Sequence, residues 1–285
     1  SYLQVINFWR KITLLVGDKD GNGLDLSGFR VSFDVEKTAL QDPNTAKIDI
    51  YNLSKTTVAR IADGDLKRIV LQAGYESHNA VIFDGNIIST SQVRNGADTI
   101  LSIDAGDGQS GYSYALVNET VGAGYSNNDI AKKSFNAMKE RGVKNDDLKA
   151  VSNETKYPRG RVLFGAARNY SREVSKNSDT QWSVQDGHLV YCKKNATRDD
   201  RKAFILRPDT GMIGSPKKDK DGVTVSCCLN ALLRIYDPIR IESEFLTGDF
   251  KILSLKHSGD THGNEWSTEI KACSLDPSTK KTTKK

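Results

Sequence analysis

Two clusters of residues have types and spacing that could bind a metal ion. The first half of a calcium-binding EF-hand loop, with side-chain oxygens at alternate positions before a turn glycine, is matched by Asp18, Asp20, Asn22 and Gly23. The match ends at the twelfth position, where Phe29 stands in place of the bidentate Glu, and the flanking residues alternate as strands do. We therefore interpret this loop as a polar hairpin turn whose glycines supply positive φ.

The second cluster lies near the end of the chain. His257 and His262 are five residues apart across an expected hairpin, within reach of Asp260, and imidazole and carboxylate groups are zinc ligands. No convincing third ligand accompanies them, so we interpret the segment as an exposed polar turn.

Signals for catalysis are weak. There is no G-x-S-x-G elbow, and Gly122-Ala123-Gly124 lacks the lysine of a phosphate-binding loop. Glu242 and Glu244 alternate with Ile241, which puts both carboxylates on one strand face; a glycosidase pair is one interpretation and a solvated face the simpler one. We predict no catalytic residue, no cofactor and no metal.

The four cysteines have no repeated spacing. Cys227 and Cys228 are adjacent and cannot form a C-x-x-C metal knuckle, while Cys192 and Cys273 lie apart from them. We interpret all four as reduced structural thiols. Alternation within the expected strand 223–229 predicts that Cys227 is a core residue and Cys228 its outward neighbour.

Length and composition favour a globular protein with a sizeable core. The chain has 285 residues, of which 37% are hydrophobic and 27% charged, and it contains no apolar run near the roughly 20 residues of a membrane helix. It begins without the features of a signal peptide, so we expect the protein to be made and to stay at first in a cytoplasm. Of the net charge of +5, four charges come from lysines of the last ten residues. Apart from these four lysines the charge is near +1, which argues against a strongly nucleic-acid-binding surface.

Period-two alternation predicts that residues 1–110 form a first β module. Val31, Phe33 and Val35 alternate with polar residues, so one strand face should be buried. Ser54 should cap a short helix that stops at Gly64, and the Asn-Gly pair in the segment 94–97 predicts a hairpin.

Residues 111–205 should form an α+β connector with two helices and a hairpin. Asn127 or Asn128 should cap the first helix, which Gly142 ends. The second helix is predicted within 160–179, where one face carries Leu163, Ala167, Tyr170 and Val174. A hairpin with a turn at Asp186-Gly187 is predicted over 181–193.

The third region, 206–275, should be a second β module, followed by a basic flexible tail at 276–285. Its strands resemble the end of the first module. Arg68-Ile69 and Arg240-Ile241 open comparable segments, and Ile87 and Ile103 match Ile252 and Ile270 at intervals of 16 and 18 residues. We interpret this as a weak internal repeat.

Several longer phrases, in order along the chain, resemble the baseplate hub proteins of contractile-tailed bacteriophages. The phrases are LSGFRVSFDVEKTALQDPNTAKIDIYNLSKTTVARI, AGYESHNAVIFDGNIIST, GRVLFGAARNYSREVSKNSDTQWSVQDG and DFKILSLKHSGDTHGNEWSTEIKA. They extend from about Leu26 to Ala272 and contain no catalytic motif. The resemblance implies a mainly β (α+β overall) fold in which two tail-tube-like β-barrel modules are joined by the connector.

The resemblance also implies a function. Three subunits would form a trimeric, pseudo-sixfold ring that joins the tail tube, or a tube-initiator protein, to the central spike and surrounds the genome-delivery channel. Baseplate wedge proteins and the tape measure protein are further candidate partners. Within such an assembly we expect the turn from His257 to Asn264, which includes Asp260 and His262, to contact a neighbouring subunit or ring. DNA would pass without specific binding, no membrane anchor is expected, and the protein would be located in the virion tail baseplate.

Three alternatives remain open. The same hub could serve a tailocin or another contractile injection system. A cell-wall hydrolase would need an active site that the sequence does not display. A receptor- or sugar-binding tail component could use exposed tryptophans, but Trp9, Trp182 and Trp266 all lie in expected strands, where burial is usual.

Overall fold

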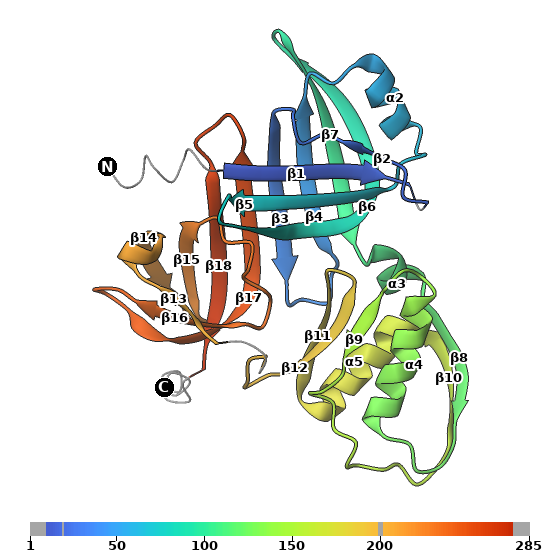
Figure 1. Cartoon of the computed structure of the whole chain (residues 1–285). Helices are drawn as coiled ribbons and strands as arrows, with labels where there is room; N and C mark the ends of the chain where they lie inside the picture. Colours follow the sequence, from blue (N-terminus) through green and yellow to red (C-terminus); the bar gives the residue numbers. More distant parts are fainter. Residues whose placement is uncertain (1–9, 19, 199–201, 276–285) are drawn as a thin grey trace.

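The computed structural model describes residues 10–18, 20–198 and 202–275. The predicted basic tail, 276–285, and Trp9 lie outside the described residues. The fold is mainly β, as predicted, and a small group of helices covers one part of it (Figure 1). No described helix is long and apolar enough to cross a lipid bilayer.

The first β region contains seven strands and one helix. They are β1 (Arg10–Gly17), β2 (Gly23–Asp25), β3 (Val31–Thr38), β4 (Asn44–Tyr51), α2 (Lys55–Ala62), β5 (Arg68–Tyr75), β6 (His78–Asn95) and β7 (Asp98–Asp107). The predicted alternation is confirmed in β3, where Val31, Phe33 and Val35 are buried. Ser54 caps α2 as predicted, since its hydroxyl accepts a hydrogen bond from the Thr57 backbone N–H.

The connector is the group of elements between Gln109 and Lys193. Its elements are α3 (Gln109–Tyr114), β8 (Leu116–Val121), α4 (Asn127–Lys139), β9 (Asn145–Asp147), β10 (Arg161–Ala166), α5 (Ala167–Ser178), β11 (Thr180–Gln185) and β12 (His188–Lys193). Helices α4 and α5 pack between a two-stranded sheet, β8–β10, and a three-stranded sheet, β11–β12–β9 (Figure 1).

Two predictions for the connector were wrong in detail. The N-cap of α4 is Ser126 and not Asn127 or Asn128, because Ser126 and Asp129 form a reciprocal capping box. The predicted second helix begins only at Ala167, since the preceding six residues form β10 and pair with β8. Leu163 was included in the predicted helix face because it is apolar, and it is buried as the helical residues after it are, but it belongs to strand β10.

The last region is again mostly strand. It contains β13 (Phe204–Leu206), a 3₁₀ turn (Pro208–Thr210), β14 (Met212–Lys218), β15 (Val223–Cys228), β16 (Pro238–Glu242), β17 (Thr247–Asp260) and β18 (Trp266–Ser274). Cys227 is buried and Cys228 is half-buried, which confirms the predicted alternation in β15.

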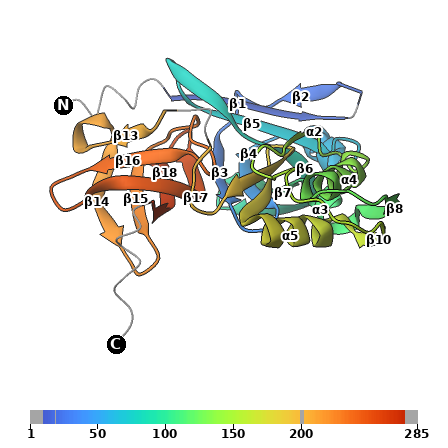
Figure 2. The same cartoon turned by 90° about the horizontal axis from the view of Figure 1, so that it is seen from below.

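The two β regions share one continuous sheet. Among the described residues the pairing follows the open path β14-β15-β18-β17-β3-β4-β7-β6-β5-β1-β2, with β16 beside β17 and β13 beside β16. β17 of the last region therefore pairs with β3 of the first (Figure 2). The two closed β-barrels that the resemblance implied are not seen, because the described strands form no closed ring of pairs.

Two five-stranded units with the same strand order lie within this sheet. We call β3-β4-β7-β6-β5 the first unit and β14-β15-β18-β17-β16 the second unit; neighbours are antiparallel in both. The β6–β7 register shifts between Ile87 and Ser89, and the β17–β18 register shifts between Ile252 and Ser254. The sequence repeat had matched Ile87 with Ile252, so an equivalent bulge occupies the matched position in each unit.

The same pairing corrects one detail of the repeat. Arg68 lies opposite Asn86, one residue before Ile87, and the corresponding position, opposite Lys251, is held by Pro238. The predicted match of Arg68 with Arg240 is thus two residues out of register. The division at residues 110 and 205 into modules stays a prediction.

Candidate assembly site

The boundary between the two units combines strand pairing with a side-chain clasp. Seven residue pairs join β17 to β3, from Ser254 opposite Thr38 to Asp260 opposite Ser32. The β17–β18 turn, residues 261–265, then continues past the end of β3. The segment predicted to contact another subunit, from His257 to Asn264, comprises the end of β17 and most of this turn.

Asp260 forms its ion pair within the chain. Arg30, just before β3, donates from Nη2 to Oδ2 at 2.9 Å and from Nε to Oδ1 at 3.3 Å, and the His262 backbone N–H donates to Oδ1 at 2.9 Å. Partial burial opposes ionisation of Asp260, but these donors outweigh it and the pKa of the carboxyl is lowered. The carboxylate therefore fastens the second unit to the first.

Arg10 holds the other side of the turn. Its guanidinium donates to the carbonyl oxygens of Gly263 at 2.7 Å and Asn264 at 3.0 Å, and it lies 5.2 Å from the centre of the Trp266 ring. The cation thereby satisfies backbone acceptors of the turn while its flat face packs on the indole. Both ends of the turn are thus anchored by arginines of the first β region.

Trp266 itself is buried in the core of the first unit. It is 4% exposed and packs edge-on against Phe33 with ring centres 5.5 Å apart. Its Nε1 donates to the Gly74 carbonyl at 3.2 Å. Burial of this residue was predicted; its location in the core of the other unit was not.

The four predicted interface residues are not equivalent. His257 lies inside β17, is completely buried, and shares a 2.8 Å hydrogen bond between its Nδ1 and Thr268 Oγ1. Burial, together with the nearby charge of Lys37, lowers the pKa of its imidazole to about 3. Since its side chain is inaccessible, His257 cannot be the surface contact that we expected.

The remaining predicted residues stay near the surface. His262 and Asn264 are exposed in the turn, while the Asp260 side chain is 18% exposed. The imidazole of His262 shares a 2.9 Å hydrogen bond between its Nδ1 and the hydroxyl of the neighbouring Thr261. A contact of His262 and Asn264 with another subunit stays a prediction.

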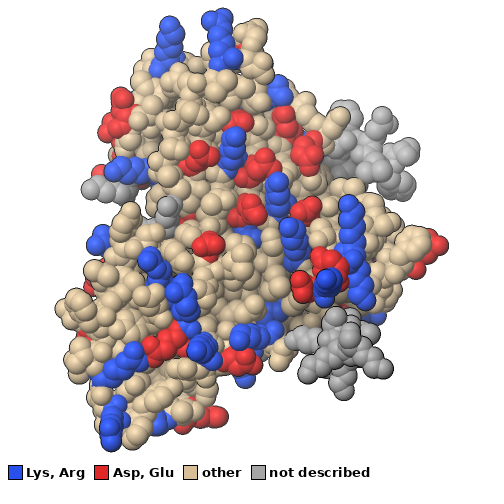
Figure 3. All heavy atoms as spheres, turned by 180° about the vertical axis from the view of Figure 1, so that it is seen from behind, with Lys and Arg blue, Asp and Glu red and all other residues tan. Residues whose placement is uncertain are grey.

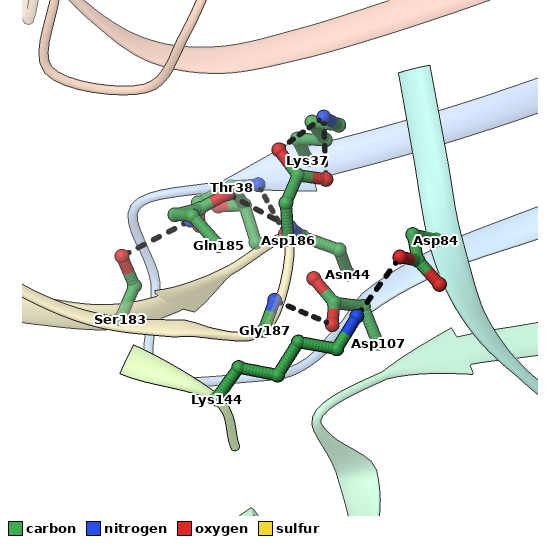
Figure 4. Close-up of polar contacts among 10 residues, drawn as sticks. All are labelled: Lys37, Thr38, Asn44, Asp84, Asp107, Lys144, Ser183, Gln185, Asp186 and Gly187. Carbon is green, nitrogen blue, oxygen red and sulfur yellow. Dashed lines mark hydrogen bonds and ion pairs between the residues drawn. The ribbon is translucent and has the colours of Figure 1, made fainter. Parts of the chain in front are cut away.

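A second polar junction fixes the connector to the first unit (Figure 4). Lys37 of β3 is only 6% exposed at its side chain, and its Nζ lies 2.9 Å from Oδ1 of Asp186 in the β11–β12 turn. Next to this pair, Asn44 donates to the Gln185 side chain at 2.7 Å, and Gln185 donates to the Thr38 carbonyl at 2.7 Å. The tip of the predicted hairpin is therefore docked against the end of the β3–β4 hairpin.

Asp107, at the end of β7, lies beneath that turn. Its Oδ1 accepts a hydrogen bond from the Gly187 backbone N–H at 3.1 Å, and its side chain faces the connector (Figure 4). Burial, followed by repulsion from Asp186, raises the pKa of Asp107 to about 7, although Lys37 acts in the opposite direction. The junction thus contains a carboxyl group that ionises near neutral pH.

The second unit is joined to the connector by a buried lysine. Lys251 of β17 is completely buried, and its Nζ donates to the Lys193 carbonyl at 2.7 Å and to Gln181 Oε1 at 3.1 Å. The ammonium also lies 5.1 Å from the centre of the Tyr236 ring. Burial lowers the pKa of this lysine. The connector therefore fastens both units, in addition to their direct pairing.

The face of the sheet opposite the cores is polar and continuous across the boundary. Two rows of alternating charge cross neighbouring strands, Glu269–Lys256–Glu36 and Asp34–Lys47–Asp104. Each lysine is flanked by two carboxylates, an arrangement that favours pairing of the strands in register. From behind, basic and acidic side chains are interspersed over the visible face without a large patch of one sign (Figure 3).

The other residues considered for chemistry have structural partners. Asp18 closes the β1–β2 turn, because its carboxylate accepts hydrogen bonds from the backbone N–H groups of Asp20 and Asn22. Glu242 pairs with Arg240 at 2.9 Å, and Glu244 lies in the turn beyond β16, so the predicted common strand face is absent. Within the described ranges, no group of three or more His, Cys, Asp or Glu could hold a metal ion.

Sequence reasoning missed Lys37 and Asp107. Lys37 follows Val31, Phe33 and Val35 at the next inward-facing position of β3. A lysine at such a position predicts an oppositely charged or polar partner, because lysine is rarely buried without one. Asp107 ends an alternating strand and gave no comparable signal.

Comparison with known proteins gives a family. A sequence model described as "Baseplate hub gp41" matches residues 11–272. No curated protein sequence matches the chain.

Solved structures share the fold at low sequence identity. A 43 kDa tail protein of prophage MuSo2 from Shewanella oneidensis is 9% identical, covers 94% of this chain and 98% of its own, and has a TM-score of 0.64. A tail protein from Neisseria meningitidis MC58 is 11% identical, with coverages of 93% and 96% and a TM-score of 0.66. The E. coli c3393 protein, described as a component of the type VI secretion system, is 8% identical, with coverages of 87% and 74% and a TM-score of 0.54.

Proposed function

The chain belongs to the baseplate hub gp41 family, and from this premise we propose that three copies form a pseudo-sixfold ring at the distal end of a phage contractile tail. Membership gives the protein a structural role in a phage baseplate. The observation that supports the ring is that the chain contains two five-stranded units with the same strand order and equivalent bulges. Three chains would present six similar units, which could meet a sixfold tube on one side and a threefold spike on the other.

The contacts that hold the two units together support this role. The two units are joined by β17–β3 pairing, by the clasp on the β17–β18 turn, and by the connector, which contacts both units. A hub that transmits force between a tube and a spike must keep its two units in fixed orientation. In this proposal the tail tube or a tube-initiator protein and the central spike are the axial partners, and wedge and tape measure proteins are further candidates.

We assign the polar sheet face to the wall of the genome-delivery channel. Lys256 and Lys47 on this face are each flanked by two carboxylates, which reduces the positive charge that the face could offer to phosphates. DNA would pass along such a hydrated wall without specific binding. We further propose that the protein is not an enzyme, is assembled in the host cytoplasm and is located in the virion.

One observation favours a second candidate. The fold is shared with the E. coli c3393 protein, described as a type VI secretion component, so a tailocin or another contractile injection system could use the same hub. Purified particles containing this chain distinguish the two. A packaged genome supports the phage, and a tail without a head supports the alternative.

Mass photometry and negative-stain electron microscopy of the purified chain test the ring. We expect a particle of three times the chain mass of 31.4 kDa with a central opening. A chain that stays monomeric at all concentrations, alone and with its tube and spike proteins, contradicts the proposal. Clearing of peptidoglycan in a zymogram would support the hydrolase alternative.

A further inference from the structure

Each unit has strand edges at which a strand of another unit can pair. Within the chain, one edge of the second unit, on β17, is already paired with one edge of the first unit, on β3. After its bulge, β17 pairs with β18 on one side and with β3 of the first unit on the other. The Ala39 backbone N–H donates to the Leu253 carbonyl at 2.8 Å. Leu253 and every second residue after it therefore direct their backbone N–H and C=O groups toward β3. We use this β17–β3 pairing as the template for the way in which a strand of one unit pairs with a strand of another.

The corresponding edge of the first unit is open. The repeat relates Ser254–Asp260 of β17 to Ser89–Asn95 of β6. Among the described residues this part of β6 pairs only with β7, because β5 ends opposite Asn86. It projects as part of the β6–β7 arm at the top of Figure 1.

The backbone polarity of the open edge follows from the turn. Asn95 and Asp98 flank a two-residue hairpin turn, and flanking residues of such turns exchange hydrogen bonds. Val93 and Ser91 then face β7, and the intervening Gln92 directs its N–H and C=O away from β7. Gln92 is exposed, as are Ser91 and Val93, and none of the three carries a charge that would discourage pairing.

The matching edge belongs to β14. In the repeat β14 occupies the position of β3, and in the described part of the chain it pairs only with β15. We propose that β6 of one copy pairs with β14 of the next copy, in the antiparallel arrangement that β17 and β3 adopt within the chain. This inference rests on the proposed ring and names the strands that close it.

The template also fixes the register. In the template Asp260 lies opposite Ser32. The repeat relates Asp260 to Asn95, and it relates Ser32 to Ile213 because the two residues pair with equivalent residues of β4 and β15. Asn95 should therefore lie opposite Ile213 of the next copy. Ser258 opposite Asp34 likewise becomes Val93 opposite Lys217.

Between these two positions β14 departs from the template. Its register against β15 shifts between Ile213 and Lys217, where Gly214 adopts a φ of +66° and Pro216 has no N–H to donate. Pairing with β6 is therefore restricted to the two ends of β14. A single junction is short, and closure of the ring stabilises three of them together. A heterologous contact of this kind, with β6 and β14 on every chain, gives a ring of three when each copy is rotated by one third of a turn from the last.

Substitution of Gln92 by proline tests the pairing. Proline removes the outward N–H and places its ring where the next strand would lie, but it removes no bond to β7. We expect wild-type chain and the control Gln92→Ala to give a trimer in mass photometry, and Gln92→Pro to give a monomer with unchanged circular dichroism. A trimer that persists in Gln92→Pro overturns the strand pairing and leaves the proposed ring intact. A wild-type chain that forms no trimer, either alone or with its tube and spike proteins, overturns both.

A cysteine pair checks the register independently. Val93→Cys combined with Lys217→Cys should form disulfide-linked dimers and trimers under mild oxidation, whereas each single variant should not. The intrachain template provides the matched control, since Ser258→Cys with Asp34→Cys should cross-link without a change in mass. Absence of the intermolecular cross-link in a trimeric double variant contradicts the register.

Discussion

The indole Nε1 of Trp266, in the second unit, donates a hydrogen bond of 3.2 Å to the backbone carbonyl of Gly74, in the first β region. The two residues are 192 positions apart, and the contact places a side chain of one unit inside the core of the other. Unfolding of either unit should therefore expose apolar surface of both. We expect the units to unfold as one cooperative structure.

Truncation of Trp266 should destabilise both units together. Because the indole is 4% exposed and packs on Phe33, Trp266→Ala should lower the free energy of unfolding by about 3–5 kcal/mol. Trp266→Phe should cost less, since it keeps most of the burial and loses the hydrogen bond. Urea titration measures both values. Phe245→Ala is the control, because Phe245 is 76% exposed and its loss should change stability little.

Charge reversal at Asp260 should act on the isolated chain. Asp260→Lys removes the acceptor of Arg30 and brings two cations together, so thermal stability should fall before assembly is tested. A double-mutant cycle with Arg30→Met should give a favourable coupling energy that weakens as salt is added. A coupling energy of zero in the isolated chain, together with a trimer that Asp260→Lys destabilises, would show that Asp260 acts in a contact between subunits.

Asp107 should make stability depend on pH in a defined window. The folded carboxyl keeps its proton up to about pH 7, whereas the unfolded one loses it near 3.8. Between these values the folded state binds more protons, so stability contributed by Asp107 falls as pH rises. The advantage of Asp107→Asn over wild type should therefore grow from pH 4 to pH 7, by at most about 1.4 kcal/mol per pH unit.

Comparison of the two chains isolates this effect. His257 has a lowered pKa of about 3 and acts in the opposite direction, since its contribution falls as pH drops below 6.5, but it is present in both chains and cancels. A difference in unfolding free energy that is constant across the window would show that Asp107 is already ionised in the folded protein.

Gly259 should not tolerate a methyl group. A Cβ there would lie 2.5 Å from Phe33 Cζ and 2.7 Å from Trp266 Cε3, within the aromatic pair that joins the units. Gly259→Ala should therefore cost about 1–3 kcal/mol through overpacking. Gly28→Ala is the matched control, since no atom lies within 4 Å of its Cβ. Equal thermal midpoints for the two variants would show that the aromatic pair can shift.

Local pattern in the sequence was sufficient for most elements of the fold. Alternation of Val31, Phe33 and Val35 predicted β3, and turn residues at Asn95-Gly96 and Asp186-Gly187 predicted two hairpins that the structure contains. These features depend on residues near one another in the chain, so the sequence determines them directly. The match of Ile87 with Ile252 likewise predicted where equivalent bulges occur.

Only the tertiary structure decided how these elements meet. Strand alternation states that one face is buried but not which edge lies beside which, so the sequence could not show that β17 pairs with β3 or that Asp260 faces Arg30. The same holds for Lys37, whose partner Asp186 is 149 residues away. Hydrogen-bonding groups along a strand edge are nearly identical from strand to strand, and the shape of the whole folded chain selects among them.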